Sequence, residues 1–125
     1  MNLYRQEIIE RSRFPRCREE MSNADVQGEV LNELCGDELT LFFMFDKQRK
    51  RMEKVTFMGQ GCALMAAAAD MLCEYLTDKT KEELANFSGH DMLKLYGESP
   101  SPSRLKCVLL GYEALQRALK GMASN

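Results

Sequence analysis

The chain has 125 residues, of which 45% are hydrophobic and 29% charged, and its formal net charge is -2. This length fits one domain with a buried core, and the composition excludes a disordered chain. The nearly balanced charge gives no reason to expect nucleic-acid binding. The longest apolar run, Cys62 to Ala69, is far shorter than the roughly 20 residues of a membrane span, and no apolar signal segment opens the chain. We therefore expect a cytoplasmic protein that binds neither nucleic acid nor membrane.

The first half of the chain predicts one helix followed by three strands. Leu3 to Arg13 is expected to form a short helix that Pro15 ends, and an irregular polar segment follows. Apolar residues then alternate, most clearly from Leu39 to Phe45, as they do in strands. The expected strands cover Asp25 to Leu34, Glu38 to Asp46 and Arg51 to Met58. Their short connections predict an antiparallel meander, and the apolar second face at Phe42 must pack under another element or form a contact surface.

The second half of the chain predicts helices. Gly59-Gln60-Gly61 interrupts the strand pattern, and the alanine-rich segment after it favours a helix with a wide apolar face. Ser101 and Pro102 suit the first positions of the last helix. The expected helices cover Cys62 to Leu76, a short segment opened by the capping box Thr80 to Glu83, Asp91 to Leu95, and a last helix that Gly121 closes. This order predicts an α+β fold, with a three-stranded antiparallel sheet and helices packed mainly on one face.

Three of the five cysteines occupy distinctive settings. Cys35 precedes Gly36-Asp37 between two strands, Cys62 begins the alanine-rich helix, and Cys107 lies in the second turn of the last helix. The positive end of a helix dipole is expected to lower the pKa of Cys62 and, more weakly, that of Cys107. If the three thiolates meet Asp37, their repulsion requires a cation, and the set suits zinc or an iron–sulfur cluster. The spacing Cys-x26-Cys-x44-Cys has no Cys-x-x-Cys pair, so buried free thiols remain an equal alternative.

The remaining candidates have simpler explanations. Cys73 is expected to be structural, because eleven residues of helix place it roughly 16 Å from Cys62. Cys17 lies among arginines that could activate a thiol, although an incidental loop cysteine is the simpler interpretation. His90 is a possible ligand or a solvated loop residue. The remaining candidate is a basic loop of Lys47, Arg49, Lys50 and Arg51. It is expected either to contact an acidic partner or to be a solvated turn.

Three short motifs resemble those of the IscU/NifU/SufU family of iron–sulfur cluster scaffold proteins. They are Cys35-Gly36-Asp37, Gly59-Gln60-Gly61-Cys62-Ala63 and Arg104-Leu105-Lys106-Cys107. The Phe14-Pro15-Arg16 exit of the first helix and the Thr80–Leu84 segment are also similar, so the likeness covers nearly the whole chain. The resemblance implies one SufE/NifU-like domain over residues 1–125. It further implies that a metal or a transient [2Fe–2S] cluster binds at four residues, with Zn²⁺ or Fe²⁺ at the same place: Cys35, Asp37, Cys62 and Cys107.

The chain departs from each branch of this family. Lys106 stands where IscU-type members have histidine, which resembles the SufU branch. Only 44 residues separate Cys62 from Cys107, whereas SufU-type members typically carry an insertion there. Residues 99–103 replace the chaperone-recognition motif Leu-Pro-Pro-Val-Lys, and Glu33-Leu34 replace the usual proline before the first cysteine. The branch, and with it the choice between scaffold and sulfur acceptor, stays open.

Our leading hypothesis is a cluster assembly scaffold with a cysteine desulfurase and recipient apo-proteins as partners. Cys107 is expected to accept persulfide sulfur, because it lies about 200° around the helix from Leu105 and so off the core stripe. Asp37 would be the weaker ligand that keeps the cluster transferable. Lys106 either offsets the negative charge of the site or is a plain solvated lysine.

Two alternatives remain, a zinc-dependent sulfurtransferase and a structural zinc domain. The sequence contains no phosphate loop, nucleophile elbow or HExxH motif, so a hydrolytic enzyme is poorly supported. We therefore expect a scaffold or carrier rather than an enzyme, with sulfurtransferase activity as the exception. The apolar second face of the Phe42 strand is a weak indication of self-association, so we expect a monomer or a weak homo-oligomer.

Overall fold

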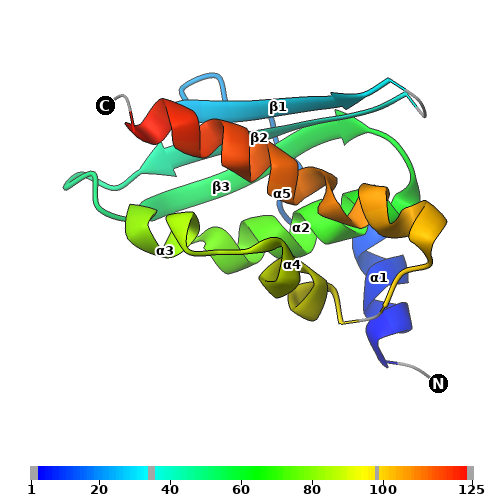
Figure 1. The fold of residues 1–125 in the computed structure, drawn as a ribbon. Helices are drawn as coiled ribbons and strands as arrows, with labels where there is room; N and C mark the ends of the chain where they lie inside the picture. The colour runs from blue at the N-terminus through cyan, green and yellow to red at the C-terminus, as the bar shows by residue number, and fades with distance from the viewer. Residues whose placement is uncertain (1–2, 34–35, 98, 124–125) are drawn as a thin grey trace.

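The chain folds into a three-stranded antiparallel sheet with helices packed on one of its faces (Figure 1). This computed structural model describes residues 3–33, 36–97 and 99–123. The strands, in sheet order, are β1 (Val26–Asn32), β2 (Asp37–Phe45) and β3 (Met52–Gln60). The helices are α1 (Leu3–Arg13), α2 (Ala63–Leu76), α3 (Lys81–Ala85), α4 (Gly89–Tyr96) and α5 (Pro102–Ala123). The predicted fold class is confirmed, and no helix among these described residues is long and apolar enough to cross a membrane.

The alternation along β2 points one row of side chains at the helices. Leu39, Leu41 and Phe43 are each at most 1% exposed and belong to the main core. Helix α5 lies over β1 and β2, α2 lies over β3 and beside α5, and α1 packs against α2 (Figure 1). Four consecutive alanines of α2, residues 66–69, are buried, and their small side chains let this helix approach its neighbours closely. The start of α2 and the start of α5 therefore lie at the same end of the sheet as the start of β2.

The middle of the second face of the sheet is covered by the chain itself. The segment after α1 hydrogen-bonds the outer edge of β3, where the Glu19 amide donates to the Phe57 carbonyl at 3.0 Å. The chain then crosses behind the sheet to β1, and Met21 is only 4% exposed. Phe42 and Thr56, on that second face, are 7% and 3% exposed. Of the two alternatives for the apolar face, packing under another element is found at Phe42, whereas Leu31 on the same face is 55% exposed.

Two glycines expected to end elements lie inside them. β3 continues through Gly59 to Gln60, and α5 continues through Gly121 to Ala123. A Cβ on Gly59 would lie 2.4 Å from the Glu38 carbonyl oxygen, and one on Gly121 would lie 2.8 Å from a methyl carbon of Val26. These glycines permit close approach of a neighbouring element rather than termination. Residue 34 of the first expected strand lies outside the described residues.

The predicted short helices are present with slightly different limits. The Thr80 and Glu83 capping box opens α3 as expected. Helix α4 is longer than predicted, because Ser88 and Asp91 form a second capping box that starts it at Gly89. Two reciprocal hydrogen bonds fix each of these starts.

Candidate metal centre

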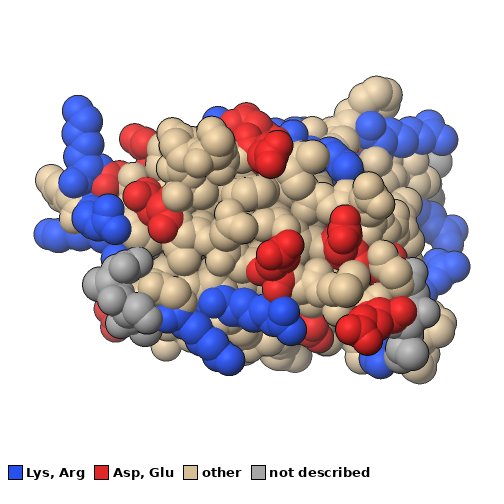
Figure 2. Space-filling model, turned by 90° about the horizontal axis from the view of Figure 1, so that it is seen from above, with Lys and Arg blue, Asp and Glu red and all other residues tan. Residues whose placement is uncertain are grey.

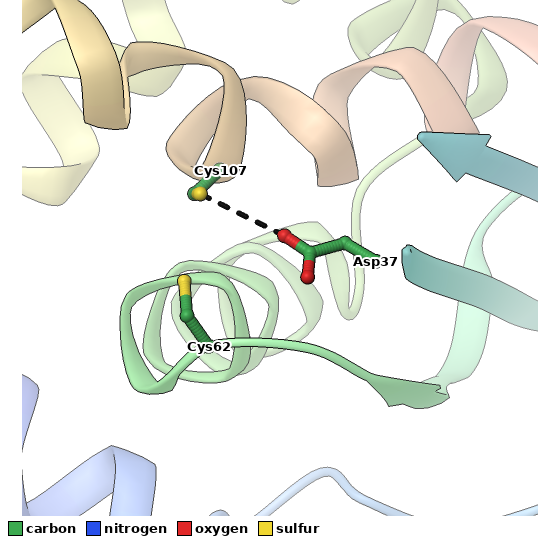
Figure 3. Close-up of side chains that lie close together, drawn as sticks. All are labelled: Asp37, Cys62 and Cys107. Carbon is green, nitrogen blue, oxygen red and sulfur yellow. Dashed lines mark hydrogen bonds between the residues drawn. The ribbon is translucent and has the colours of Figure 1, made fainter. Parts of the chain in front are cut away.

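Three of the four predicted ligands meet at one end of the sheet (Figure 3). Asp37 begins β2, Cys62 is the N-cap residue of α2, and Cys107 lies in the second turn of α5. One ligand atom from each of these residues lies within 4.8 Å of the other two. The Cys107 thiol donates a hydrogen bond of 3.7 Å to Oδ2 of Asp37. Cys35, the fourth predicted ligand, lies outside the described residues.

Local backbone geometry aims these side chains at one another. Gly36 adopts a φ of 74°, the left-handed conformation that glycine tolerates, directly before Asp37. Cys62 has extended backbone angles and makes no side-chain cap hydrogen bond, so its sulfur is left to face the site. Gly61 has no side chain, and a Cβ there would lie 2.9 Å from Oδ1 of Asp37 and 2.8 Å from the sulfur of Met65. The Asp37 carboxylate therefore occupies space that a Cβ at position 61 would need.

The three side chains differ in how far solvent reaches them. Asp37 is 7% exposed, Cys107 is half-buried and contacts the core, and Cys62 is exposed. The expectation that Cys107 points off the core is therefore met only in part. The site is closed by protein on the side of Asp37 and open on the side of Cys62. An open side admits a partner or an exchanging ligand, whereas structural zinc sites are closed by four protein ligands.

The donor set fits a small thiophilic cation. Two thiolate sulfurs and one carboxylate oxygen are ligands that zinc and iron accept. With metal–sulfur bonds of about 2.3 Å, tetrahedral ligands lie about 3.8 Å apart. The ligand atoms of Asp37, Cys62 and Cys107 already lie within 4.8 Å of one another, so a small inward movement suffices.

The electrostatic expectation for Cys107 is wrong for the thiol as it stands. Burial raises the pKa of Cys107 to about 12, and the neighbouring Cys62 and Asp37 add to the increase. The helix dipole weakens by the second turn, so it cannot outweigh desolvation and two acidic neighbours. A cation held between these groups would favour the thiolates instead.

The other candidates from the sequence lie elsewhere. Cys73 is 0% exposed and lies in the core, as the structural interpretation predicts. Burial raises the pKa of Cys17 to about 11, with Asp70 and Glu74 adding to it, so the neighbouring arginines do not activate this thiol. His90 is exposed on α4 and is not part of the ligand group found among the described residues.

One contact that supports the site has no signal in the sequence. The guanidinium of Arg18 donates a 2.8 Å hydrogen bond to the carbonyl of Gly59, in the segment that leads to Cys62. Arg18 reaches Gly59 only because the segment after α1 runs along the outer edge of β3. The Gly-x-Gly pattern predicts close backbone approach at Gly59 and Gly61, which the structure confirms, but it does not identify Asp37 as the neighbour.

Replacing Gly61 by alanine is expected to weaken Zn²⁺ binding about 10-fold or more, because the new methyl group displaces the Asp37 carboxylate. Competition of the protein with a chromophoric chelator measures this affinity. The matched control is Gly89→Ala, since a Cβ there meets only the Tyr112 ring at an ordinary 3.6 Å. Equal zinc affinity in Gly61→Ala and the natural protein would show that Asp37 does not depend on this space.

Comparison with known proteins places this arrangement in a family. A model described as "NifU-like N terminal domain" matches residues 3–124. The chain is 25% identical to the iron–sulfur cluster assembly scaffold protein IscU of Streptococcus pyogenes serotype M1, over 98% of this chain and 86% of that protein. It is 28% identical to the zinc-dependent sulfurtransferase SufU of Bacillus subtilis (strain 168), over 94% of this chain and 89% of that protein.

A solved structure supports the same conclusion. A candidate iron–sulfur cluster assembly scaffold protein for the SUF system from Fervidobacterium islandicum AW-1 superposes with a TM-score of 0.75 and 30% identity. The match covers 91% of this chain and 94% of that one. The resemblance carried by the three cysteine motifs is thus confirmed, and the chain belongs to the NifU-like N-terminal domain family.

Proposed function

We propose that this protein is a scaffold on which an iron–sulfur cluster is assembled and then passed to recipient apo-proteins. The observation that carries the proposal is the meeting of Asp37, Cys62 and Cys107, with ligand atoms within 4.8 Å of one another and Cys62 open to solvent. Cys35 is the proposed fourth ligand, since it precedes Asp37 by two positions. The cluster, a [2Fe–2S] unit, is cargo, so the site must both bind it and release it.

The mixed ligand set suits cargo of this kind. Thiolates bind iron strongly as soft ligands, whereas a carboxylate oxygen is harder and holds the cluster more weakly. Cys62 and Cys107 are the proposed anchors, and Asp37 is the ligand that gives way on transfer. The exposure of Cys62 leaves a path by which a recipient protein can approach.

The proposed sulfur donor is a cysteine desulfurase that carries a persulfide. The acceptor thiolate attacks the outer sulfur, the S–S bond of the donor breaks, and the desulfurase cysteine leaves as a thiolate. The acceptor now bears the persulfide, and two electrons from an external reductant convert this sulfur to sulfide. Cys107 is the proposed acceptor and Cys62, whose side chain is more exposed, is its rival. This chemistry suits the cytoplasm, where thiols stay reduced.

A zinc-dependent sulfurtransferase is the second candidate function. The similarity to the Bacillus subtilis SufU favours it, as does the basic residue Lys106 directly before Cys107. In this function Zn²⁺ occupies the same ligands until the desulfurase displaces one of them and frees a nucleophilic cysteine. A purely structural zinc site is less well supported, because Cys62 is exposed.

Anaerobic reconstitution with iron(II) and sulfide tests the scaffold function. We expect visible absorption of a cluster in the natural protein and its loss in Cys62→Ala and Cys107→Ala. Asp37→Ala is expected to keep the cluster and to transfer it to an apo-ferredoxin at least about 10-fold more slowly. Cys17→Ala is the matched control, since Cys17 lies away from the site, and it should assemble the cluster normally.

The alternatives give different results in the same experiment. Mass spectrometry after incubation with a desulfurase and cysteine detects a persulfide. A persulfide on Cys107 without any cluster would favour the sulfurtransferase function over the scaffold function. A persulfide on Cys62 alone would show that Cys62, and not Cys107, accepts the sulfur. A zinc ion that never exchanges, with neither persulfide nor cluster, would leave only the structural role.

A further inference from the structure

A basic surface lies at the end of the molecule opposite the metal centre. It combines the exposed turn between β2 and β3 with the turn between α2 and α3, and we name it the basic tip. Its members are Lys47, Arg49, Lys50, Arg51, Lys79 and Lys81. Figure 2 shows Lys and Arg side chains at the end that carries the β2–β3 turn in Figure 1, with Asp and Glu side chains beside them. Phe45 at the tip and Asp37 at the site are the two ends of β2, about 27 Å apart at strand rise.

Hydrogen bonds join the two turns into one unit. The Met52 amide donates to the Lys79 carbonyl at 2.9 Å, and the Asp78 amide donates to the Met52 carbonyl at 2.8 Å. The Arg51 guanidinium donates to the Asp78 carbonyl at 2.8 Å. Within the β2–β3 turn, Oδ1 of Asp46 accepts the backbone amide of Lys50 at 2.9 Å. The cations of the tip are therefore held on a fixed backbone.

The backbone of the tip adopts conformations that L-residues rarely use. Arg49 has a φ of 57° and Asp78 a φ of 72°, and among the described residues these are the non-glycine residues with positive φ. Such conformations persist where the surroundings impose them, and they concentrate at functional sites. Each of the two turns contains one such residue, so both halves of the basic tip have a backbone position with positive φ.

Aromatic rings hold several of the cations in place. The guanidinium of Arg49 lies 4.9 Å and the ammonium of Lys81 lies 4.3 Å from the centre of the Phe45 ring. The ammonium of Lys79 lies 4.7 Å from the centre of the Tyr75 ring. These contacts fix long side chains without neutralising their charge, so less conformational entropy is lost when an anion binds.

Most cations of the tip make no close ion pair. Arg49 makes a 3.6 Å ion pair with Asp25, and within the part of the chain that the structure describes the other five cations make none. The nearby carboxylates of Asp46 and Glu83 accept hydrogen bonds from backbone amides, and they interact with Arg51 and Lys79 beyond ion-pair distance. Because the whole chain has a net charge of -2, the six cations gathered here leave the rest of the chain more acidic.

We propose that the basic tip docks an acidic segment of a protein partner and leaves the metal centre free. The surface is short and bordered by acidic residues, and the protein as a whole is acidic. These features favour a short acidic peptide over a long continuous polyanion such as nucleic acid. A partner anchored about 27 Å from the centre can stay bound while another protein reaches Cys62. The proposal does not depend on the ion or cluster held there.

Binding of a fluorescein-labelled ten-glutamate peptide tests the proposal, with fluorescence anisotropy as the readout. The triple variant Lys47→Gln/Lys50→Gln/Lys81→Gln is expected to bind at least about 10-fold more weakly than the natural protein, and the loss should shrink at high salt. The matched control is Arg5→Gln/Arg13→Gln/Lys94→Gln, which removes the same charge from exposed residues elsewhere. It should bind within about 2-fold of the natural protein, because steering by net charge alone is weak here.

Each other result overturns the proposal. Equal losses in the two triple variants would mean that net charge alone attracts the peptide, and absence of binding would mean that there is no docking surface. Equally tight binding of a ten-glutamine peptide would exclude charge recognition. A single-stranded DNA of ten nucleotides that binds more tightly than the peptide and is lost in the tip variant would assign the surface to nucleic acid. Zinc affinity serves as an internal control and should be unchanged in both variants.

Discussion

Replacing Gly28 by alanine is expected to lower the free energy of unfolding by about 3 kcal/mol or more, because the new methyl group would meet backbone atoms. A Cβ at Gly28 would lie 2.0 Å from the carbonyl oxygen of Ala114 and 2.8 Å from the amide nitrogen of Ala118. Neither atom can rotate away, so α5 has to move off β1. Urea denaturation followed by circular dichroism measures the loss.

The same substitution is expected to reach the metal centre. Cys107 lies on α5, and its distance to Asp37 depends on how closely this helix packs on the sheet. Zinc affinity should therefore fall together with stability in Gly28→Ala. Gly89→Ala is the matched control, because its Cβ meets only the Tyr112 ring at 3.6 Å. The control should stay within about 0.5 kcal/mol of the natural protein. A Gly28→Ala protein of natural stability would contradict the close approach of β1 and α5.

Gly28 also shows which part of the fold local patterns could predict. The alternation along β2 and the alanine block of α2 are signals within single elements, and both elements form as expected. A glycine that lets a neighbour approach and a glycine that ends an element look the same in a sequence. Gly59 and Gly121 were expected to end elements and instead lie inside them, because the neighbour that decides is far away in the chain.

The metal centre was predictable only in part for a similar reason. The three cysteine motifs identify the ligands through the resemblance, whereas the spacing between them does not. The sequence could not predict that Cys62 is exposed and Cys107 half-buried, since tertiary packing determines the exposure of each side chain. The expected lowering of the Cys107 pKa is also wrong, because the helix dipole is a local effect and tertiary packing adds the burial that raises this pKa.

The attachment of α1 was the largest feature without any local signal. Asp70 lies in the alanine-rich helix α2 and is 0% exposed. Its Oδ2 accepts a 2.7 Å hydrogen bond from Arg11, and its Oδ1 accepts one of 2.7 Å from the backbone amide of Cys17. Burial alone would lower the pKa of Arg11, but its hydrogen bonds with Glu74, Asp70 and Glu7 raise it above the usual range. One carboxylate thus fastens both α1 and the segment that leads to the outer edge of β3.

Replacing Asp70 by alanine is expected to cost about 3–5 kcal/mol of folding free energy, because it leaves the Arg11 cation and the Cys17 amide without their buried partner. Asp70→Asn keeps an acceptor for the Cys17 amide and should cost less. Urea denaturation of the three proteins measures both losses. Protection of α1 amides from hydrogen exchange should fall more than that of β2, because α1 is the element that Asp70 holds.

Glu74→Gln separates a buried ion pair from an exposed one. The side chain of Glu74 is 46% exposed, so its removal should cost no more than about 1 kcal/mol. The hydrogen bond from Arg11 holds the pKa of Glu74 below its usual value. Its contribution is therefore present above the usual glutamate pKa and is lost as the pH falls through the lower pKa of the folded state. Below that range Glu74→Gln and the natural protein should be equally stable. At neutral pH, Asp70→Ala should have a lower free energy of unfolding than Glu74→Gln. A loss in Asp70→Ala as small as that in Glu74→Gln would mean that α1 is held by apolar packing alone.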